Sequence, residues 1–409
     1  MLSQTQMSQS PKSPARKTSQ AGPSLSGTNL ERAGDYNQRV TLQSIRIGGA
    51  KTKPEIAALT GLTVPAITNI TKRLLDDGLI VEAGKLHGGR GQPAMTLAVN
   101  PDGCFSIGLN IDRDHVTILL LDFAGQVRAR STWEVAFAGP DAVAEFFETN
   151  WKTFLKTKGV EAERIIGVGV AMPDDMARVG LPHRPAEYGA WNTTDVRQLL
   201  SRRHDLPVTV ENDAAAAALG ELHFGHGMNA PSFFYVLVTS GLGGGLVVEG
   251  EYFRGAQGRS GELGFLPVTS PRIDVATLQE AVSLSALAQF LENNGFSIAG
   301  PGDLETLPQK GLDAVEAWID LAADLLTGPM VAVSCLINPQ AVYIGGRLPE
   351  SLVDRLAAAL ETKLSAVAGV PALAPVQRAA LAADAPAMGA AILPIIERLL
   401  PSRAALQKT

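Results

Sequence analysis

Acidic and amide side chains adjoin one another at Glu211-Asn212-Asp213, directly after an apolar run and before an alanine-rich stretch. If the run is a strand and the stretch is a helix, these groups lie at the edge of a cleft, where they can bind sugar hydroxyls. A carboxylate in that place can also take the proton from a hydroxyl that attacks a phosphate. The same residue types are common helix caps, so capping is an equal alternative for this segment.

Glycines supply a second possible chemistry. The segment from Thr239 to Gly245 contains four glycines, and further glycine-rich segments follow at 258–264 and 344–346. Glycines allow backbone amides to approach a phosphate closely. A hairpin turn without a ligand is an equally good interpretation of the first segment.

The flanking elements must position these residues. Runs rich in apolar and β-branched residues alternate with helical stretches, which is typical of an α/β body. The predicted strands span 105–111, 116–122, 165–170, 208–210, 233–239, 243–248 and 341–344. The predicted helices span 141–158, 195–203, 214–222 and 388–400, and the region after residue 280 is mostly helical.

Residues 35–100 have a different pattern, which predicts a winged helix-turn-helix. A helix near 37–47 precedes a second one that opens with Thr52 and Glu55, at the spacing of a capping box. Thr63 is predicted to cap a third helix, with Pro65 in its first turn. Two short strands at 78–82 and 95–99 enclose a glycine-rich, basic loop that would form the wing.

The third helix is predicted to enter the major groove of DNA, because its apolar residues recur on one face and leave polar residues on the other. An arginine in the wing, Arg90, suits a narrow minor groove. The predicted DNA-binding residues are Thr63, Thr68, Asn69, Lys72, Arg73, Arg90 and Gln92. For Thr68 and Lys72, solvent exposure without contact is the alternative.

The charge distribution agrees with a DNA-binding N-terminal part. Residues 37–100 carry eight basic and four acidic residues, a balance of +4, and residues 1–36 carry a balance of +2. Since the whole chain has a net charge of −6, the remaining 309 residues carry −12. A small basic module on a large acidic body predicts that the protein contacts phosphates only through its N-terminal part.

Composition excludes several other classes of protein. Residues 1–34 are rich in Ser, Gln, Pro and Gly and are predicted to be a disordered tail. The two cysteines, Cys104 and Cys335, are too few for a disulfide framework and are expected to be buried. No apolar run of about 18 residues is evident, so we expect no membrane span and a cytoplasmic location.

Together these segments resemble the ROK family, which combines sugar kinases with sugar-responsive transcriptional repressors. The resemblance covers roughly residues 36–395, and its specificity lies in the order and spacing of the motifs. The matching motifs are 211–221, Ser240-Gly-Leu-Gly-Gly-Gly245, Gly261-Glu-Leu-Gly264, Asn338-Pro339, Ile344-Gly-Gly346 and Met388-Gly-Ala-Ala391. The resemblance implies an N-terminal winged helix-turn-helix followed, at 101–409, by an α/β two-lobed sugar-kinase-like domain of the actin/hexokinase ATPase type.

Two departures from the family pattern concern enzyme activity and metal binding. The kinases open with Asp-x-Gly-Gly-Thr, whereas the matching residues here are Asn110-Ile-Asp112-Arg113-Asp114. Carboxylates there would repel the nucleotide phosphates, so we expect no kinase activity and no nucleotide cofactor. The family's zinc histidine falls on Phe265, and 270–283 has no cysteine, so we expect no structural zinc.

The resemblance also implies that a sugar pocket is partly retained. Its predicted hydroxyl-binding residues are Asn212, Asp213, Glu262 and Gln279, where Gln279 stands in place of a family glutamate. Glutamine can both donate and accept hydrogen bonds, whereas an ionised glutamate only accepts them. The ligand preference is therefore expected to differ from that of glucose-binding members.

The sequence thus favours a transcriptional regulator, most simply a repressor, that binds operator DNA and responds to a sugar or sugar derivative. Paired DNA-binding modules would require a homodimer or homotetramer. An active sugar kinase with an appended DNA-binding module is the alternative, and a constitutive DNA-binding protein with a ligand-free body is a third, weaker one.

Overall fold

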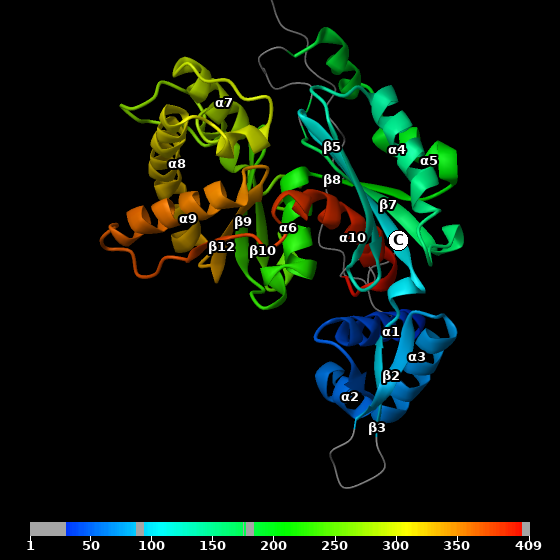
Figure 1. Cartoon of the computed structure of the whole chain (residues 1–409). Helices are drawn as coiled ribbons and strands as arrows, with labels where there is room; N and C mark the ends of the chain where they lie inside the picture. Colours follow the sequence, from blue (N-terminus) through cyan, green and yellow to red (C-terminus); the bar gives the residue numbers. More distant parts are fainter. Residues whose placement is uncertain (1–29, 87–93, 175, 177–183, 403–409) are drawn as a thin grey trace, which may run out of the picture.

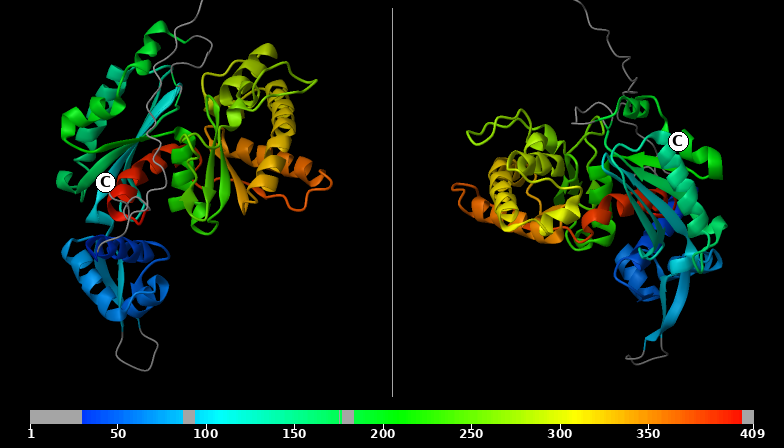
Figure 2. Two further views of the ribbon diagram at one scale, coloured as in Figure 1. Left: turned by 180° about the vertical axis from the view of Figure 1, so that it is seen from behind. Right: turned by 45° about the horizontal axis from the view of Figure 1, so that its top comes forward.

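Three sheets organise the chain, and the computed structural model describes residues 30–86, 94–174, 176 and 184–402. A small N-terminal unit lies at one end of the molecule, and two lobes, each built on a five-stranded sheet, follow it along the chain (Figure 1). The views in Figure 2 place the N-terminal unit, drawn in blue, below the first lobe and away from the yellow and orange helices of the second.

The N-terminal unit packs three helices against a three-stranded antiparallel sheet of order β1-β3-β2. Its elements are α1 (Leu30–Arg46), β1 (Lys51–Thr52), α2 (Lys53–Thr60), α3 (Val64–Asp76), β2 (Ile80–Leu86) and β3 (Ala94–Val99). Helix α1 begins at Leu30, inside the segment 1–34 that the sequence predicted to be a disordered tail. The helix predicted near 37–47 therefore starts earlier, because the more polar residues before it are helical as well.

Local capping explains where α2 and α3 begin. The Thr52 hydroxyl accepts a bond from the Glu55 amide at 3.4 Å, and the Glu55 carboxylate accepts one from the Thr52 amide at 2.7 Å, which forms the predicted capping box. The bond from the Thr52 amide, followed by one that the Thr52 hydroxyl donates to the same carboxylate at 2.8 Å, holds the pKa of Glu55 below its ordinary value. Thr63 caps α3 by accepting from the Ala66 amide at 3.4 Å.

The first lobe has a sheet of order β6-β5-β4-β7-β8. Strands β4, β5 and β6 form an antiparallel meander, and β7 and β8 are parallel to β4. Its elements are β4 (Phe105–Ile111), β5 (His115–Asp122), β6 (Val127–Glu134), α4 (Pro140–Phe154), β7 (Ile165–Ala171), α5 (Val196–His204) and β8 (Val208–Glu211). Strand β6 was missed by the sequence prediction, and α4 ends at Phe154 rather than at 158.

The second lobe has a sheet of order β11-β10-β9-β12-β13. A large apolar core joins this sheet to α7, α8 and α9, and α6 packs against β9 and β10. The elements are α6 (Asp213–Phe224), β9 (Phe233–Val238), β10 (Leu242–Val248), β11 (Glu251–Tyr252), α7 (Leu284–Asn293), α8 (Gln309–Leu336), β12 (Ala341–Gly346), α9 (Glu350–Ser365) and β13 (Val376–Arg378). The last helix, α10 (Ala385–Leu399), returns to pack on β4 and β7 of the first lobe.

Helices α6 and α10 cross between the two lobes and contact each other closely (Figure 1). A Cβ atom on Gly389 of α10 would lie 1.6 Å from the carbonyl oxygen of Ala216 on α6. A Cβ on Gly169 of β7 would lie 1.7 Å from the carbonyl oxygen of Ala390. The motif from Met388 to Ala391 is therefore glycine- and alanine-rich because the backbones approach to distances that side chains would prevent.

Two predictions about apolar residues need correction. Within the described ranges, α8 is the one helix long and apolar enough to span a bilayer, although the sequence analysis found no such run. It packs as a core helix, since Trp318 is fully buried and its indole N–H donates to the Ala281 carbonyl at 3.0 Å. Cys335, expected to be buried, is exposed because it lies on the outer face of α8, whereas Cys104 is buried as expected.

The helix crossing generates a matched pair of glycine substitutions. Gly389→Ala is expected to lose at least about 2 kcal/mol of unfolding free energy, because the new methyl group overlaps a carbonyl oxygen. Gly328→Ala, on exposed α8 backbone with nothing but its chain neighbours within 4 Å, is expected to change the unfolding free energy by less than about 1 kcal/mol, because the gain in helix propensity is offset by contact of the new Cβ with Pro329. Urea unfolding followed by circular dichroism measures both. Equal effects of the two substitutions would contradict the close crossing.

Candidate functional site

The predicted sugar-binding residues come together in one pocket between the lobes. Asn212 and Asp213 lie where β8 ends and α6 begins, and they face Glu262 and Gln279 of the second lobe across that pocket. The Asn212 side-chain oxygen also accepts bonds from the Ala214 and Ala215 amides, at 2.9 and 3.1 Å. Capping and pocket lining were alternatives at the level of sequence, and in the structure this segment does both.

The remaining wall comes from three further segments. The turn between β9 and β10 contributes Thr239, Gly241, Leu242 and Gly243, so the predicted glycine-rich segment is both a hairpin turn and a pocket wall. Phe265, at the expected position of a zinc histidine, lines the pocket with an exposed side chain. The sequence analysis did not predict the other lining residues, which are Arg113, Pro173, Asp174 and Arg259.

Burial and neighbouring charge perturb the carboxyl group of Asp213. Desolvation first, and then repulsion from Asp112, raises its pKa from the ordinary 3.8 to about 7, although the positive charge of Arg113 opposes the shift. Near neutral pH this carboxyl group therefore exchanges between an acceptor-only form and a form that can also donate. A sugar hydroxyl can form a hydrogen bond with either form, because it both donates and accepts.

Arg113 extends from the β4–β5 turn of the first lobe into the pocket. The residue is 8% exposed, and its nearest described carboxylate is Asp112, 3.8 Å from Nη1. A Cβ atom on Gly241, on the opposite wall, would lie 3.2 Å from that same nitrogen. The sequence-based prediction gave Arg113 no role in the pocket, although a long, charged side chain where the family kinases have a glycine was the available signal.

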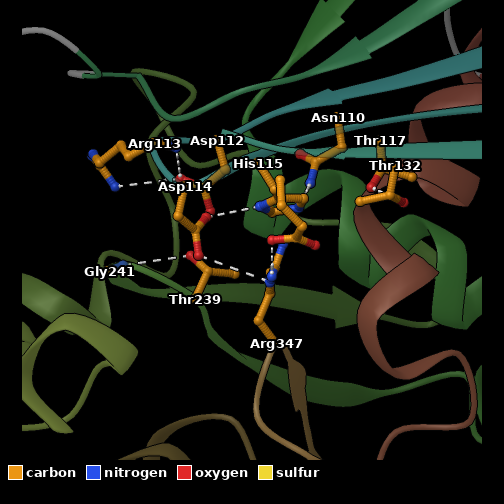
Figure 3. Close-up of polar contacts among 11 residues, drawn as sticks. Asn110, Asp112, Arg113, Asp114, His115, Thr117, Thr132, Thr239, Gly241 and Arg347 are labelled. Carbon is orange, nitrogen blue, oxygen red and sulfur yellow. Dashed lines mark hydrogen bonds and ion pairs between the residues drawn. The ribbon is translucent and has the colours of Figure 1, made fainter. Parts of the chain in front are cut away.

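The same turn joins the two lobes through a cluster formed by Asp114, His115, Glu134 and Arg347 (Figure 3). Arg347 follows β12 in the second lobe and contacts Glu134 at 2.8 Å and Asp114 at 3.8 Å in the first. Desolvation would raise the pKa of Asp114, but the hydrogen bond from His115 and the charge of Arg347 outweigh it and lower that pKa. We call these four residues the interlobe cluster.

One group of described residues has the composition of a metal site, but its environment opposes a cation. Asp112, Asp114 and His115 present ligand atoms within 4.8 Å of one another. Both ring nitrogens of His115 are already engaged, one with Asp114 at 2.8 Å and the other with the Asn110 amide at 3.1 Å. Arg347 further neutralises the cluster, so these residues do not fit a metal ion.

The predicted DNA-reading residues of α3 are presented on one exposed face. Thr63, Thr68, Asn69, Lys72 and Arg73 are exposed, whereas Ile67 and Leu74 on the opposite face are fully buried. The Thr68 hydroxyl donates to the Val64 carbonyl at 2.9 Å, so only its acceptor capacity is left for a ligand. Arg90 and Gln92 lie outside the described residues.

Helix α1 attaches the N-terminal unit to the lobes by two arginines. Arg39 donates to the carbonyls of Glu397 and Leu400 at the end of α10, at 2.9 and 3.4 Å. Arg46 donates to the His223 carbonyl at 3.4 Å and lies 4.9 Å from the ring centre of Phe224, at the end of α6. Burial lowers the pKa of Arg46 to about 10, so it remains charged at neutral pH.

A family model described as "ROK family" matches residues 106–396. The chain belongs to the ROK family. The match covers both lobes and includes every pocket segment described above. Family membership, which the sequence motifs had indicated by resemblance, is thereby confirmed.

Named ROK relatives include regulators as well as kinases. The chain is 25% identical over 346 residues to the "DNA-binding transcriptional dual regulator NagC" of Escherichia coli, covering 79% of this chain and 83% of that one. It is 23% identical over 236 residues to the "Xylose repressor" of Bacillus subtilis, covering 57% of this chain and 60% of the repressor. An uncharacterized protein of Sinorhizobium fredii is 28% identical and covers 88% of this chain and 90% of its own length.

Solved ROK structures share the fold. A ROK family transcriptional regulator, a homolog of the Escherichia coli MLC protein, aligns with a TM-score of 0.65 and 20% identity over 90% of this chain and 98% of its own. A ROK hexokinase from Thermus thermophilus aligns with a TM-score of 0.52 and 24% identity over 72% of this chain and 98% of its own. The two-lobed α/β kinase-like architecture predicted from sequence is therefore confirmed.

The zinc site that ROK membership implies does not fit this chain. Phe265 offers no donor atom where the family has a histidine, and Cys104 belongs to the first lobe, far along the chain from the zinc-binding segment. Within the described parts of the second lobe, Cys335 is the single cysteine, and it lies on α8. We derive no role for zinc.

The raised pKa of Asp213 predicts that one substitution becomes more stabilising as the pH rises. The raised pKa means that the folded state favours the neutral form of Asp213. The stabilising contribution of this group is therefore fully present below pH 3.8 and is lost as the pH rises toward 7. Asp213→Asn cannot ionise and so avoids that loss. The free energy of unfolding of the variant, relative to that of the wild type, should therefore increase by about 2 kcal/mol between pH 5 and pH 8. Thermal unfolding across this range measures it. An advantage that shrinks with pH would contradict the assigned shift.

Proposed function

We propose that this ROK protein is a sugar-responsive, DNA-binding transcriptional repressor whose kinase-like body acts as a sensor. One observation carries the proposal: the N-terminal end of α6 supplies Asn212 and Asp213 to the pocket, while its C-terminal end contacts Arg46 of the N-terminal unit. A single rigid helix therefore joins a candidate ligand site to a candidate DNA-reading unit. The names of the NagC and Xylose repressor relatives support the same assignment.

The N-terminal unit, residues 35–100, is proposed to be a winged helix-turn-helix. Helix α3 would enter the major groove with Thr63, Thr68, Asn69, Lys72 and Arg73, all of which face solvent. The side chains of Asn69 and Lys72 have no hydrogen bond or ion pair with the described part of the chain, so both are available to bases or phosphates. Arg90 and Gln92 would contact the minor groove from the wing.

The pocket is proposed to bind a sugar or sugar derivative. Asn212, Asp213, Glu262 and Gln279 line it with acceptors and donors on two sides, which is the chemistry that sugar hydroxyls require. Because Arg113, Pro173 and Asp174 of the first lobe line the same pocket, a bound sugar would draw the lobes together. The movement of α6 would then change the position of α1.

The alternative function is a sugar kinase with an appended DNA-binding module. Asp213 and the glycines of 241–245 favour it, since the family kinases use such groups. The β4–β5 turn opposes the kinase function, because Asp112 and Asp114 stand where the family kinases have a glycine and a threonine. Asp114 is also engaged in an ion pair with Arg347. A coupled assay of ATP turnover over hexoses and pentoses separates the two, since rates of about 1–100 s⁻¹ would support the kinase.

Operator recognition would require more than one reading unit. A homodimer or homotetramer places two α3 helices on successive half-sites, about 34 Å apart along the duplex. A sugar that repositions α1 would alter this spacing, and such couplings are typically worth about 1–3 kcal/mol. The protein would thereby release or bind its operator according to the sugar present.

Substitution of Lys72 tests the proposed DNA interface. On a DNA fragment selected from a random pool by the wild-type protein, Lys72→Ala should weaken binding and reduce the slope of log affinity against log salt by about 1. Lys310→Ala, an exposed lysine on α8, is the matched control and should change neither quantity. An unchanged slope for Lys72→Ala would remove α3 from the interface.

Substitution of Arg46 tests the proposed transmission through α6. With a sugar that alters DNA affinity of the wild type, Arg46→Met should still bind both ligands, but the coupling of about 1–3 kcal/mol should fall close to zero. Arg39→Met is the matched control, since it removes a contact of α1 with α10 instead of α6. Fluorescence anisotropy of labelled DNA, with and without sugar, measures the coupling. Equal losses in both variants would argue against α6 as the carrier.

A further inference from the structure

The guanidinium of Arg113 is buried in the pocket wall with little to neutralise it. Its Nε has no hydrogen-bond partner among the described residues, and the one described carboxylate within 4.0 Å is Asp112, at 3.8 Å. That distance is too long for a charge-assisted hydrogen bond, which typically spans about 2.7–2.9 Å. Apart from this long ion pair, the buried guanidinium makes no hydrogen bond to the described residues, and unsatisfied buried donors are costly, so its retention in a pocket points to a ligand that completes it.

The other charged groups of the pocket do not supply that partner. Glu262 lies against Arg259 and forms an ion pair with it, and Asp174 also has an interaction of its own. Asp213 carries only part of a negative charge near neutral pH, because burial raises its pKa to about 7. Arg113 is therefore the pocket cation whose hydrogen-bond donors remain open among the described residues, with Asp112 as its ion-pair partner.

The surroundings of Arg113 suit a compact anion beside a sugar. Its guanidinium faces the glycine-rich turn of the second lobe, where the absence of a side chain at Gly241 leaves room next to Nη1. Asn212 and Asp213 line the same pocket with groups that bind hydroxyls. The planar fork of arginine matches the paired oxygens of a carboxylate or phosphate, whereas a neutral hydroxyl would leave its charge uncompensated.

We propose that the pocket takes an anionic sugar, one bearing a phosphate or a carboxylate, and that Arg113 binds the anionic group while Asn212 and Asp213 hold hydroxyls. This inference rests on the proposed function, since it specifies the class of sugar that the sensor recognises. It also assigns a role to the departure at 112–114: the arginine that replaces a phosphate-loop glycine becomes a specificity-determining residue.

Calorimetry on the full chain tests the proposal with matched ligands. The neutral ligands of the panel are glucose, N-acetylglucosamine and xylose. The anionic ligands are the phosphate ester of each sugar at its terminal hydroxyl group, glucuronate, and inorganic phosphate alone. An anionic sugar should bind about 10- to 100-fold more tightly than its neutral parent, as expected for hydrogen bonds to a charged group. The phosphate and carboxylate arms identify which anion is preferred.

Variants assign the effect to Arg113. Arg113→Gln should lose this 10- to 100-fold preference, and a far-ultraviolet circular dichroism spectrum and thermal unfolding like those of the wild type would show that the variant is folded. Arg113→Lys should keep part of the preference, because it retains the positive charge. Arg130→Gln is the matched control, since Arg130 lies between the lobes and pairs with Asp384 but does not line this pocket.

Each contrary outcome has a distinct meaning. Neutral sugars that bind and alter DNA affinity, with anionic forms no tighter, would overturn the anionic specificity and leave the proposed function standing. Inorganic phosphate as tight as the sugar phosphate, or a preference that survives in Arg113→Gln, would overturn the assignment to Arg113. Failure of every sugar to bind would overturn both the inference and the sensor function.

Discussion

The close crossing of α6 and α10 is the constraint on which the rest of the molecule depends. Gly389 lies directly on the Ala216 carbonyl, so the two helices have no side chains between them that could yield. Each helix packs on the sheet of a different lobe, and both end against α1. A helix held this tightly moves as a unit, so displacement at one end reaches the other without being absorbed by repacking.

The β4–β5 turn has exchanged one electrostatic role for another. In the kinases of the family the equivalent glycines leave space for nucleotide phosphates, whereas here Asp114 joins Arg347 across the lobes and Arg113 enters the pocket. In the proposed sensor, both changes would place fixed charge where the family kinases hold nucleotide phosphates. The lobes thereby gain a direct polar contact, and the pocket gains a cation facing its ligand space.

Local signals predicted much of the fold. The capping box of Thr52 and Glu55, the cap at Thr63 and the β-branched runs of the two sheets depend on neighbouring residues, and the structure has those elements close to the predicted bounds. Strand β6 escaped notice because its sequence is polar and it is held in the sheet only by pairing with β5. Cys335 was misjudged because apolar neighbours in sequence do not ensure burial: Leu336 and Ile337, which follow it at the end of α8, are exposed as well.

The sequence by itself indicated the family and most of the elements, since both are written in contiguous motifs, and it predicts the loss of the phosphate-binding glycines, which stays a prediction. It also named Asn212, Asp213, Glu262 and Gln279, which the structure brings to one pocket. Only the tertiary structure decided that Arg113 lines that pocket and that Arg46 contacts the far end of α6. Those facts depend on approaches between segments more than a hundred residues apart, which no local pattern of side chains encodes.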